Sequence, residues 1–348
     1  MSNFKFYVLT TRNISLLERH ADHQYSGIPI EDLVVVINTK DSKYEKEASE
    51  WCASKKIEHH ITESNGTASR GKNSVLDIFL NSDQDYCVMI DGDDYLTPHG
   101  VWMYNAVSQK ESPPDVICLK DQIALVWDED LFSSWLKENS LERKEVEFSD
   151  IPEEIIRVKP HKIFDIRKEI SYDHIDEHKA YYEKQKKYCE DGEAHCRVVW
   201  YSKKAAAHKF NEELLVGEDT HQYYILKNEH YHGNINMVVN VEKPPSYIYD
   251  TSSPGVVCEV GEFGEDNRKW LVPFNNEIDR LERNDILHEN YQLPELEIDY
   301  PTNYVPEVYR VCNNHQWDVL QEGDVVTTIE HPANCSAESL RIKFEAKK

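Results

Sequence analysis

The segment Tyr86-Cys87-Val88-Met89-Ile90-Asp91-Gly92-Asp93-Asp94 predicts a buried strand that ends in an acidic cluster. Its four consecutive apolar residues favour a strand that is covered on both faces. The carboxylates follow this strand directly, so we expect them in a crevice at the end of a sheet. Two carboxylates two residues apart suit a hard divalent cation, which prefers oxygen ligands. The alternative is an Asp-Gly turn without function.

The chain before this segment predicts three strand and helix pairs. Strands are predicted at 5–11, 32–38 and 57–62. Helices are predicted at 14–25, 43–55 and 74–81. Strands that alternate with helices at this spacing form parallel βαβ units in one sheet. Ligands of such sheets bind outside the carboxyl ends of the strands, where the acidic cluster falls, so the metal site is favoured over the turn.

The chain after the acidic cluster is less regular. Residues 115–127 predict one long strand or two short ones, and the charged residues 128–193 predict an insert of helices and loops. The alternating pattern returns further on. Strands are predicted at 196–201 and 235–241, helices at 220–227 and 275–288, and a strand-like run at 324–329. These patterns predict an α/β fold with a mostly parallel central sheet.

The composition excludes some classes of protein. Sixty-four acidic and 39 basic residues give a formal charge of −25, which opposes loose binding to nucleic acid or anionic membranes. The chain has no apolar stretch of about 20 residues and no signal-peptide core, so we expect a soluble protein without membrane contact. The eight cysteines lack zinc-like spacing and are expected to be reduced thiols. These features predict a cytoplasmic location, in a host cytoplasm if the gene is carried by a phage.

A second candidate site is the run Gly66-Thr67-Ala68-Ser69-Arg70-Gly71-Lys72-Asn73, which nearly matches a phosphate-binding P-loop. Asn73 stands where the motif has Ser or Thr, and the run follows the third strand instead of the first. Because of the near match to the P-loop, a nucleoside triphosphatase is one alternative. Haloacid-dehalogenase-like phosphatases also carry Asp-x-Asp at a strand end, but with Thr or Val where Tyr95 stands.

The Asn65 to Asn73 loop, the helix after it and the run Asp91-Gly92-Asp93-Asp94-Tyr95-Leu96-Thr97-Pro98 together resemble the core of family 2-like glycosyltransferases. The resemblance implies the GT-A fold, a Rossmann-like domain that binds nucleotide sugars. It also implies that Asp91 and Asp93 hold Mn²⁺ or Mg²⁺, with a UDP-sugar as the first choice of donor.

The same resemblance extends to other parts of the donor site. Thr10 to Asn13 looks like the first strand end of the family, and Asn38 to Ser42 looks like the loop that holds the donor base and ribose. Asn38 stands where the family has Asp, and Gly71-Lys72-Asn73 replaces Ala-Arg-Asn, which leaves the donor base open. The residues expected to bind the donor are Thr11, Asn13, Asn38, Asp41, Arg70, Lys72, Asn73 and Asp91.

The segment Phe210 to Thr220 is similar to the Glu-Asp signature of this family. The resemblance implies that Asp219, beside Glu218, removes the proton of the acceptor hydroxyl in an inverting transfer. The alternative is that both acids only stabilise a helix N-terminus. Because such enzymes often take a third metal ligand from a later histidine, we expect His232 or His230 in that role. Packing or surface positions are the alternative for both.

We expect a GT-A domain over residues 1–258, in which the insert 128–195 shapes the acceptor site, and an accessory or oligomerisation region over 259–348. The acceptor stays open between a glycan, a protein and a hydroxymethylated pyrimidine in phage DNA. The basic runs 157–168 and 184–187 are the candidates for contacts with DNA, or are solvated helix faces. The rival class is a binding protein for nucleotide sugars without turnover.

Overall fold

The structure is a computed structural model of the 348-residue chain. It describes residues 3–22, 26–119, 122–127, 129–141, 156–161, 176–188, 197–240, 246–250, 268–289, 291–298, 309–311 and 317–319.

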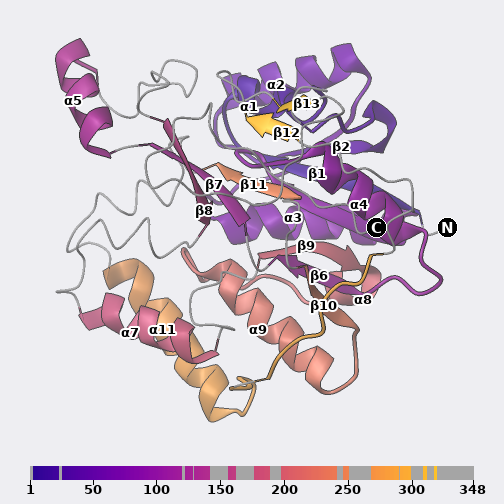
Figure 1. The fold of residues 1–348 in the computed structure, drawn as a ribbon, viewed down its shortest axis with the longest axis vertical. Coiled ribbons are helices and arrows are strands. Elements are labelled where there is room, and N and C mark those ends of the chain that lie inside the picture. Colours follow the sequence, from indigo (N-terminus) through magenta and orange to yellow (C-terminus); the bar gives the residue numbers. More distant parts are fainter. Residues whose placement is uncertain are drawn as a thin grey trace.

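A seven-stranded sheet lies at the centre of the molecule (Figure 1). Its strands are β1 (Phe4–Thr10), β2 (Leu33–Ile37), β3 (Glu58–Ile61), β4 (Tyr86–Asp91), β6 (Val116–Leu119), β9 (Arg197–Ser202) and β10 (Met237–Asn240). Their order is β10-β6-β9-β4-β1-β2-β3. Only β9 runs against the others, antiparallel to both β4 and β6. The predicted α/β fold with a mostly parallel sheet is confirmed.

A second sheet of four strands adjoins the acidic cluster. Its strands are β5 (Tyr95–Leu96), β7 (Gln122–Trp127), β8 (Ile156–His161) and β11 (Tyr247–Asp250), in the order β5-β11-β7-β8. The segment 115–127 therefore forms two strands, β6 and β7, which belong to different sheets. Two further strands, β12 (Tyr309–Val311) and β13 (Trp317–Val319), pair with each other. The strand predicted at 324–329 lies outside the described residues.

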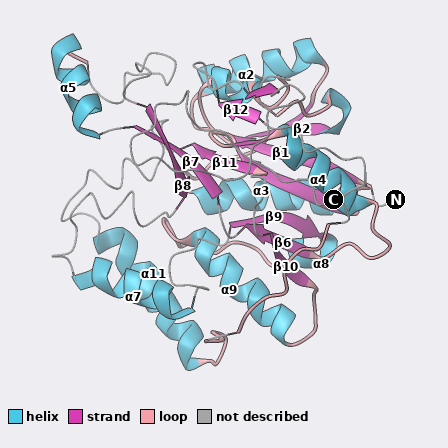
Figure 2. Cartoon of the chain, viewed as in Figure 1, coloured by secondary structure: helices cyan, strands magenta, loops and turns pink. Residues whose placement is uncertain are grey.

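In Figure 2 the helices of the described residues lie around the central sheet, except for α5, which stands apart from it. They are α1 (Ile14–Glu18), α2 (Ser42–Lys55), α3 (Ala68–Leu80), α4 (Pro98–Ser108), α5 (Glu129–Asn139), α7 (Asp176–Tyr188), α8 (Lys203–Ala206), α9 (Glu218–Tyr231) and α11 (Arg268–Arg283). The prediction for α3 was wrong at its start, because the side chain of Thr67 caps the helix by accepting a hydrogen bond from the Arg70 amide. Helix α1 is also shorter than predicted. None of the described helices combines the length and the apolar character needed to cross a bilayer.

Among the described residues, the core forms two hydrophobic clusters, one on each face of the central sheet. Alternate residues of a strand point to opposite faces. Tyr7 and Leu9 of β1 therefore belong to the first cluster, and Phe6 and Val8 belong to the second. Residues of α3, α8, α9 and α11 complete the first cluster, whereas α2 and α4 contribute to the second. Burial on both faces explains why the strands are continuous apolar runs.

Helix α11 comes from the predicted C-terminal region but packs into the first cluster. Its residues Leu271, Phe274, Ile278 and Leu281 are at most 4% exposed. It lies beside α7 of the insert (Figure 1), where the Lys184 ammonium donates to the Asn275 carbonyl at 2.8 Å. This part of the predicted accessory region therefore shares the hydrophobic core of the domain that was predicted to end at residue 258.

Candidate functional site

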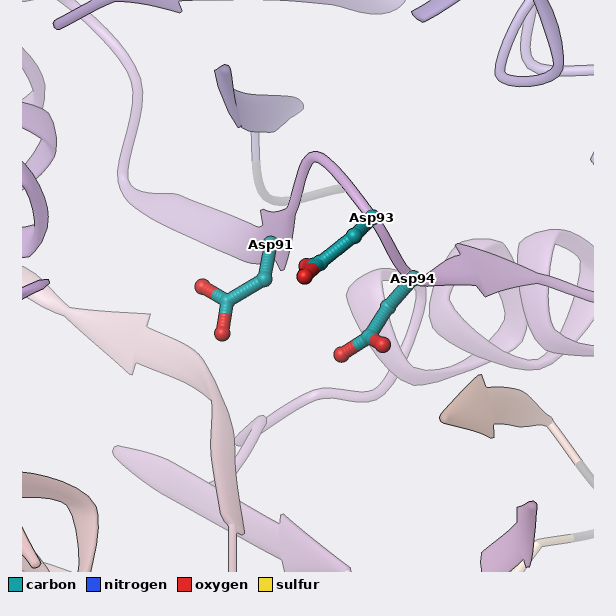
Figure 3. Close-up of side chains that lie close together, drawn as sticks. All are labelled: Asp91, Asp93 and Asp94. Carbon is teal, nitrogen blue, oxygen red and sulfur yellow. The ribbon is translucent and has the colours of Figure 1, made fainter. Parts of the chain in front are cut away.

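The acidic cluster forms a tight turn at the carboxyl end of β4. The Asp94 amide donates to the Asp91 carbonyl at 3.0 Å. A Cβ atom on Gly92 would lie 2.6 Å from the Leu9 carbonyl oxygen and 3.0 Å from the Thr10 Cα, so only glycine fits against β1. One ligand oxygen from each of Asp91, Asp93 and Asp94 lies within 4.8 Å of the other two. Figure 3 shows these three carboxylates around the turn.

Arg197 brings a guanidinium into this cluster. It is the first residue of β9, and because β9 is antiparallel, its start lies at the edge where β4 ends. Its Nη2 atom lies 2.8 Å from an Asp91 oxygen and 3.5 Å from an Asp219 oxygen. Its Nη1 atom donates to the Asp94 carboxylate. A single buried cation thus joins two carboxylates of the turn to the predicted general base.

Lys72 is the second buried cation of the site. It lies on the buried face of α3 and is 3% exposed. Its Nζ atom is 2.5 Å from Asp219, 3.0 Å from Glu218 and 3.7 Å from Asp91. Burial lowers the pKa of this lysine, but the three carboxylates outweigh burial and raise its pKa well above the usual value. Lys72 therefore stays charged inside the protein.

The first turn of α9 supplies Glu218 and Asp219. The preceding Gly217 has a φ of 72°, and a Cβ atom there would lie 2.5 Å from the Phe274 ring of α11. Glycine therefore allows α11 to pack directly against the start of α9. Burial raises the pKa of Glu218, and the Lys72 charge opposes this shift. Glu218 and Asp219 share Lys72 with Asp91, so both acids lie beside the acidic turn.

Asp94 is the most deeply buried acid of the turn, at 1% exposure. The Tyr247 hydroxyl of β11 donates to it at 2.7 Å. Burial raises its pKa to about 8, although the Arg197 charge opposes the shift. Burial and the neighbouring Asp91 charge also raise the pKa of Asp93. Among the described residues, Asp93 makes none of the close ion pairs that hold Asp91 and Asp94.

The charge of the cluster fits a divalent cation. Even without Asp94, whose pKa is raised to about 8, the four carboxylates of Asp91, Asp93, Glu218 and Asp219 outnumber the cations Lys72 and Arg197 that pair with the cluster. Clustered carboxylate oxygens are the ligands that Mg²⁺ and Mn²⁺ prefer. An additional cation beside Asp93 would favour its charged form, which burial and the Asp91 charge disfavour by raising its pKa.

Several residues predicted to bind the donor hold local structure. Asn13 caps α1 by accepting from the Ser15 amide at 3.0 Å. Asp41 caps α2 by accepting from the Lys43 amide at 2.8 Å. The buried amide of Asn38 donates to the Thr62 hydroxyl at 2.8 Å. Thr11 is exposed just beyond β1. Their contacts with a donor stay predictions.

Arg70 and Asn73 lie on α3 and contact the segment that leads to α9. The Asn73 amide donates to the Phe210 carbonyl at 3.0 Å and to the Glu212 carboxylate at 2.9 Å, and its oxygen accepts from the Phe210 amide. Arg70 lies 3.6 Å from the Glu212 carboxylate. Asn73 therefore fastens the 210–212 segment to α3.

The phosphate-loop alternative was wrong. A P-loop presents a series of free backbone amides to the phosphates. In this chain the residues from Ala68 to Asn73 are already helical, and the lysine of the motif is bonded to carboxylates. The run Gly66 to Asn73 consequently cannot cradle a triphosphate in the way that this motif requires.

The prediction of a histidine ligand was also wrong. His232 follows the last residue of the 14-residue helix α9, whereas Asp219 lies in its first turn. At about 1.5 Å per residue, the two ends of this helix are roughly 20 Å apart. His230 lies near the same distant end, where its Nδ1 atom accepts from the Met237 amide at 3.1 Å. Neither histidine reaches the acidic turn.

Sequence reasoning missed Arg197 and Tyr247. The signal for Arg197 was available, because an arginine at the start of the apolar run Arg197-Val198-Val199-Trp200-Tyr201 needs a charged partner when it is buried. Tyr247 had no comparable signal, since its neighbour Asp94 is far away in the sequence.

The fold and the site define a mostly parallel α/β protein with an acidic strand end beside a helix N-terminus. No protein family and no curated protein sequence matches the chain. The structure of S. aureus TarS 1-349 is similar at 13% identity and a TM-score of 0.43, over 83% of this chain and 67% of that chain. Its complex with UDP-GlcNAc gives 13% identity and a TM-score of 0.44, over 83% and 68%.

A third similar structure is the mannosyltransferase PcManGT from Pyrobaculum calidifontis in complex with GDP-Man and Mn²⁺. The likeness has 12% identity and a TM-score of 0.38, and covers 75% of this chain and 60% of that chain. At such low identity and TM-score, these likenesses carry no functional conclusion for this chain.

Proposed function

We propose that this protein is a GT-A glycosyltransferase that moves a sugar from a nucleotide-sugar donor to a hydroxyl acceptor, with a divalent cation at Asp91 and Asp93. One observation carries the proposal. The oxygens of Asp91, Asp93 and Asp94 cluster within 4.8 Å at the carboxyl end of a parallel strand, the edge at which such sheets bind ligands. Lys72 connects this cluster to a second pair of carboxylates.

In the proposed reaction, Asp91 and Asp93 would hold the cation, and the Glu218-Asp219 pair would provide the general base. When bound, Mn²⁺ or Mg²⁺ supplies a Lewis acid that offsets charge on the leaving diphosphate. Asp219 accepts the proton of the acceptor hydroxyl while the acceptor oxygen bonds to the anomeric carbon. The bond from that carbon to the diphosphate breaks, and the diphosphate leaves with the electron pair. Attack opposite the diphosphate inverts the anomeric centre.

Lys72 and Arg197 lie 2.5 Å and 3.5 Å from the carboxylate of Asp219, the proposed general base. Two nearby cations reduce the basicity of a carboxylate. Glu218, which shares Lys72 with Asp219, is the second candidate for the base. A role of Lys72 in binding the diphosphate requires its three carboxylate contacts to be exchanged for phosphate.

A screen of UDP-, GDP- and CMP-sugars with Mn²⁺ tests the transferase assignment. We expect slow release of the free sugar from one donor, because water can replace the acceptor. The Asp219→Asn variant should keep donor binding and lose transfer, and the Glu218→Gln variant distinguishes the two candidate bases. Binding of a donor without any turnover would favour the non-catalytic alternative, and no binding at all would contradict both.

A modified DNA base is the runner-up acceptor, but Lys184 lies 2.6 Å from Asp279 and Lys187 pairs with Glu282. These lysines are thus already paired with acids of α11, which weakens the case for DNA phosphate contacts there. The side chains of the other basic run, 157–168, lie outside the described residues.

A further inference from the structure

Two buried residues just after α1 lie behind the acidic turn. Arg19 is 6% exposed, and its Nη2 atom donates to the Asp93 carbonyl oxygen at 2.7 Å. Its guanidinium lies 4.8 Å from the centre of the Tyr95 ring. The next residue, His20, is fully buried, and its ring lies near the Gly92 backbone. Burial of an arginine costs free energy unless its charged group is hydrogen-bonded. The bond to the Asp93 carbonyl therefore ties Arg19 to the acidic turn.

The backbone of Arg19 and His20 is itself fixed. The Ser26 amide donates to the Arg19 carbonyl at 3.4 Å, and the Ile28 amide donates to the His20 carbonyl at 3.0 Å. On the other side of the turn, the space at Gly92 is closed by the Leu9 carbonyl and the Thr10 Cα. The peptide bonds between Asp91 and Asp94 are therefore held between β1 and the Arg19-His20 pair.

We propose that Arg19 is a positioning residue for the divalent cation, because its bond to the Asp93 carbonyl fixes the turn so that the Asp91 and Asp93 carboxylates face the same ion. The inference rests on the proposed function, which places a cation at this turn. The peptide after Asp93 carries the carbonyl that Arg19 holds. This carbonyl belongs to Asp93 itself, so the bond restrains the backbone from which the Asp93 carboxylate projects.

Replacement of Arg19 removes both a positive charge and a hydrogen bond, and these two losses change the cation affinity in opposite directions. A guanidinium near a divalent cation repels it, so loss of the charge alone would strengthen cation binding. Loss of a positioning contact would weaken it, and removal of groups that orient metal ligands typically costs about 10- to 100-fold in affinity. The direction of the change therefore separates a positioning role from a purely electrostatic one.

Mn²⁺ alone, titrated into the full chain and followed by calorimetry, tests this inference. We expect Arg19→Met to bind Mn²⁺ at least about tenfold more weakly than the wild type. Arg19→Lys, which can still donate to the carbonyl, should recover part of the affinity. If urea unfolding shows that Arg19→Met is not folded, Arg19→Gln carries the same test, since its shorter side chain does not reach the carbonyl.

Lys203→Met is the matched control. Lys203 also donates to backbone carbonyls, those of Leu80 and Ser82, but at the end of α3 away from the turn. Its loss should leave Mn²⁺ affinity unchanged. Equal or tighter binding by the neutral Arg19 variants would overturn the inference, as would an equal loss in the control. If the wild type binds no Mn²⁺, the proposed function fails and the inference falls with it.

Discussion

Arg197 bonds carboxylates from two elements, Asp91 and Asp94 of the turn and Asp219 of α9. We expect Arg197→Met to lower the free energy of unfolding by about 3–5 kcal/mol, because removal of one partner leaves buried charges uncompensated. Urea unfolding followed by circular dichroism measures this change.

The exposed pair of Lys46 and Glu50 on α2 provides the control for this prediction. Lys46→Met should leave the unfolding curve unchanged, because pairs in water contribute little. Similar curves for Arg197→Met and the wild type would show that the buried carboxylates do not depend on this guanidinium.

The burial of His99 should make the free energy of unfolding depend on pH. It is 3% exposed, and burial lowers its pKa to about 3. An unfolded histidine takes up a proton below about pH 6.5 while the folded one stays neutral, so stability falls as the pH falls from about 6.5 toward 3. The slope is about 1.4 kcal/mol per pH unit for one such group.

His99→Gln should therefore have a shallower loss of stability below pH 6.5 than the wild type. Urea unfolding at several pH values between 4 and 7 measures the two slopes. The buried His20, with a pKa lowered to about 3, adds the same trend to both proteins. Parallel slopes would mean that His99 is not held neutral in the fold.

Helix α3 is held at its C-terminal end by Lys203. The ammonium donates to the carbonyls of Phe79, Leu80 and Ser82, at the end where a helix leaves carbonyls without intrahelical i+4 partners. Because hydrogen bonds to a charged group contribute about 1.5–3 kcal/mol, Lys203→Met should destabilise the protein by roughly 2 kcal/mol. Thermal unfolding checks this value. An unchanged melting temperature would show that water replaces the ammonium without loss.

Element types were predictable where one physical signal dominated. The apolar runs at β1, β2 and β4 predicted buried strands, and these strands formed. The direction of β9 was not predictable, because an apolar run has the same composition in either direction. The start of α3 was missed because a single side chain, Thr67, sets it.

The site residues that are close in sequence could be predicted, whereas the contacts between distant residues could not. The acidic turn and the Glu218-Asp219 pair each follow one element, so local patterns indicated them. Their link through Lys72 and Arg197 depends on contacts across more than 100 residues. His232 was a wrong choice because its distance from Asp219 depends on the length of α9.

On the scale of the whole molecule, the predicted domain boundary at residue 258 can be tested, because α11 lies beyond it and packs into the core. A chain that ends there loses the buried side chains of Leu271, Phe274, Ile278 and Leu281. At about 1.5–3 kcal/mol each, this loss is comparable with the total stability of a domain. We expect the shortened chain to show no cooperative thermal transition.

A chain that ends at residue 298 retains α11 and the hydrogen bond from the Leu296 amide to Val239. It should unfold cooperatively, as measured by calorimetry. Cooperative unfolding of the chain ending at residue 258 would instead support a separate accessory region.

Donor binding with and without Mn²⁺ tests the metal site most directly. UDP-, GDP- and CMP-sugars are titrated into the wild type and into Asp93→Asn, which keeps the shape of the turn but removes one charged ligand. We predict that one donor binds the wild type only when Mn²⁺ is present, and that Asp93→Asn loses this dependence together with the binding. Equal donor affinity in the two proteins, or binding that is indifferent to Mn²⁺, would contradict the assignment of Asp91 and Asp93 as the cation site.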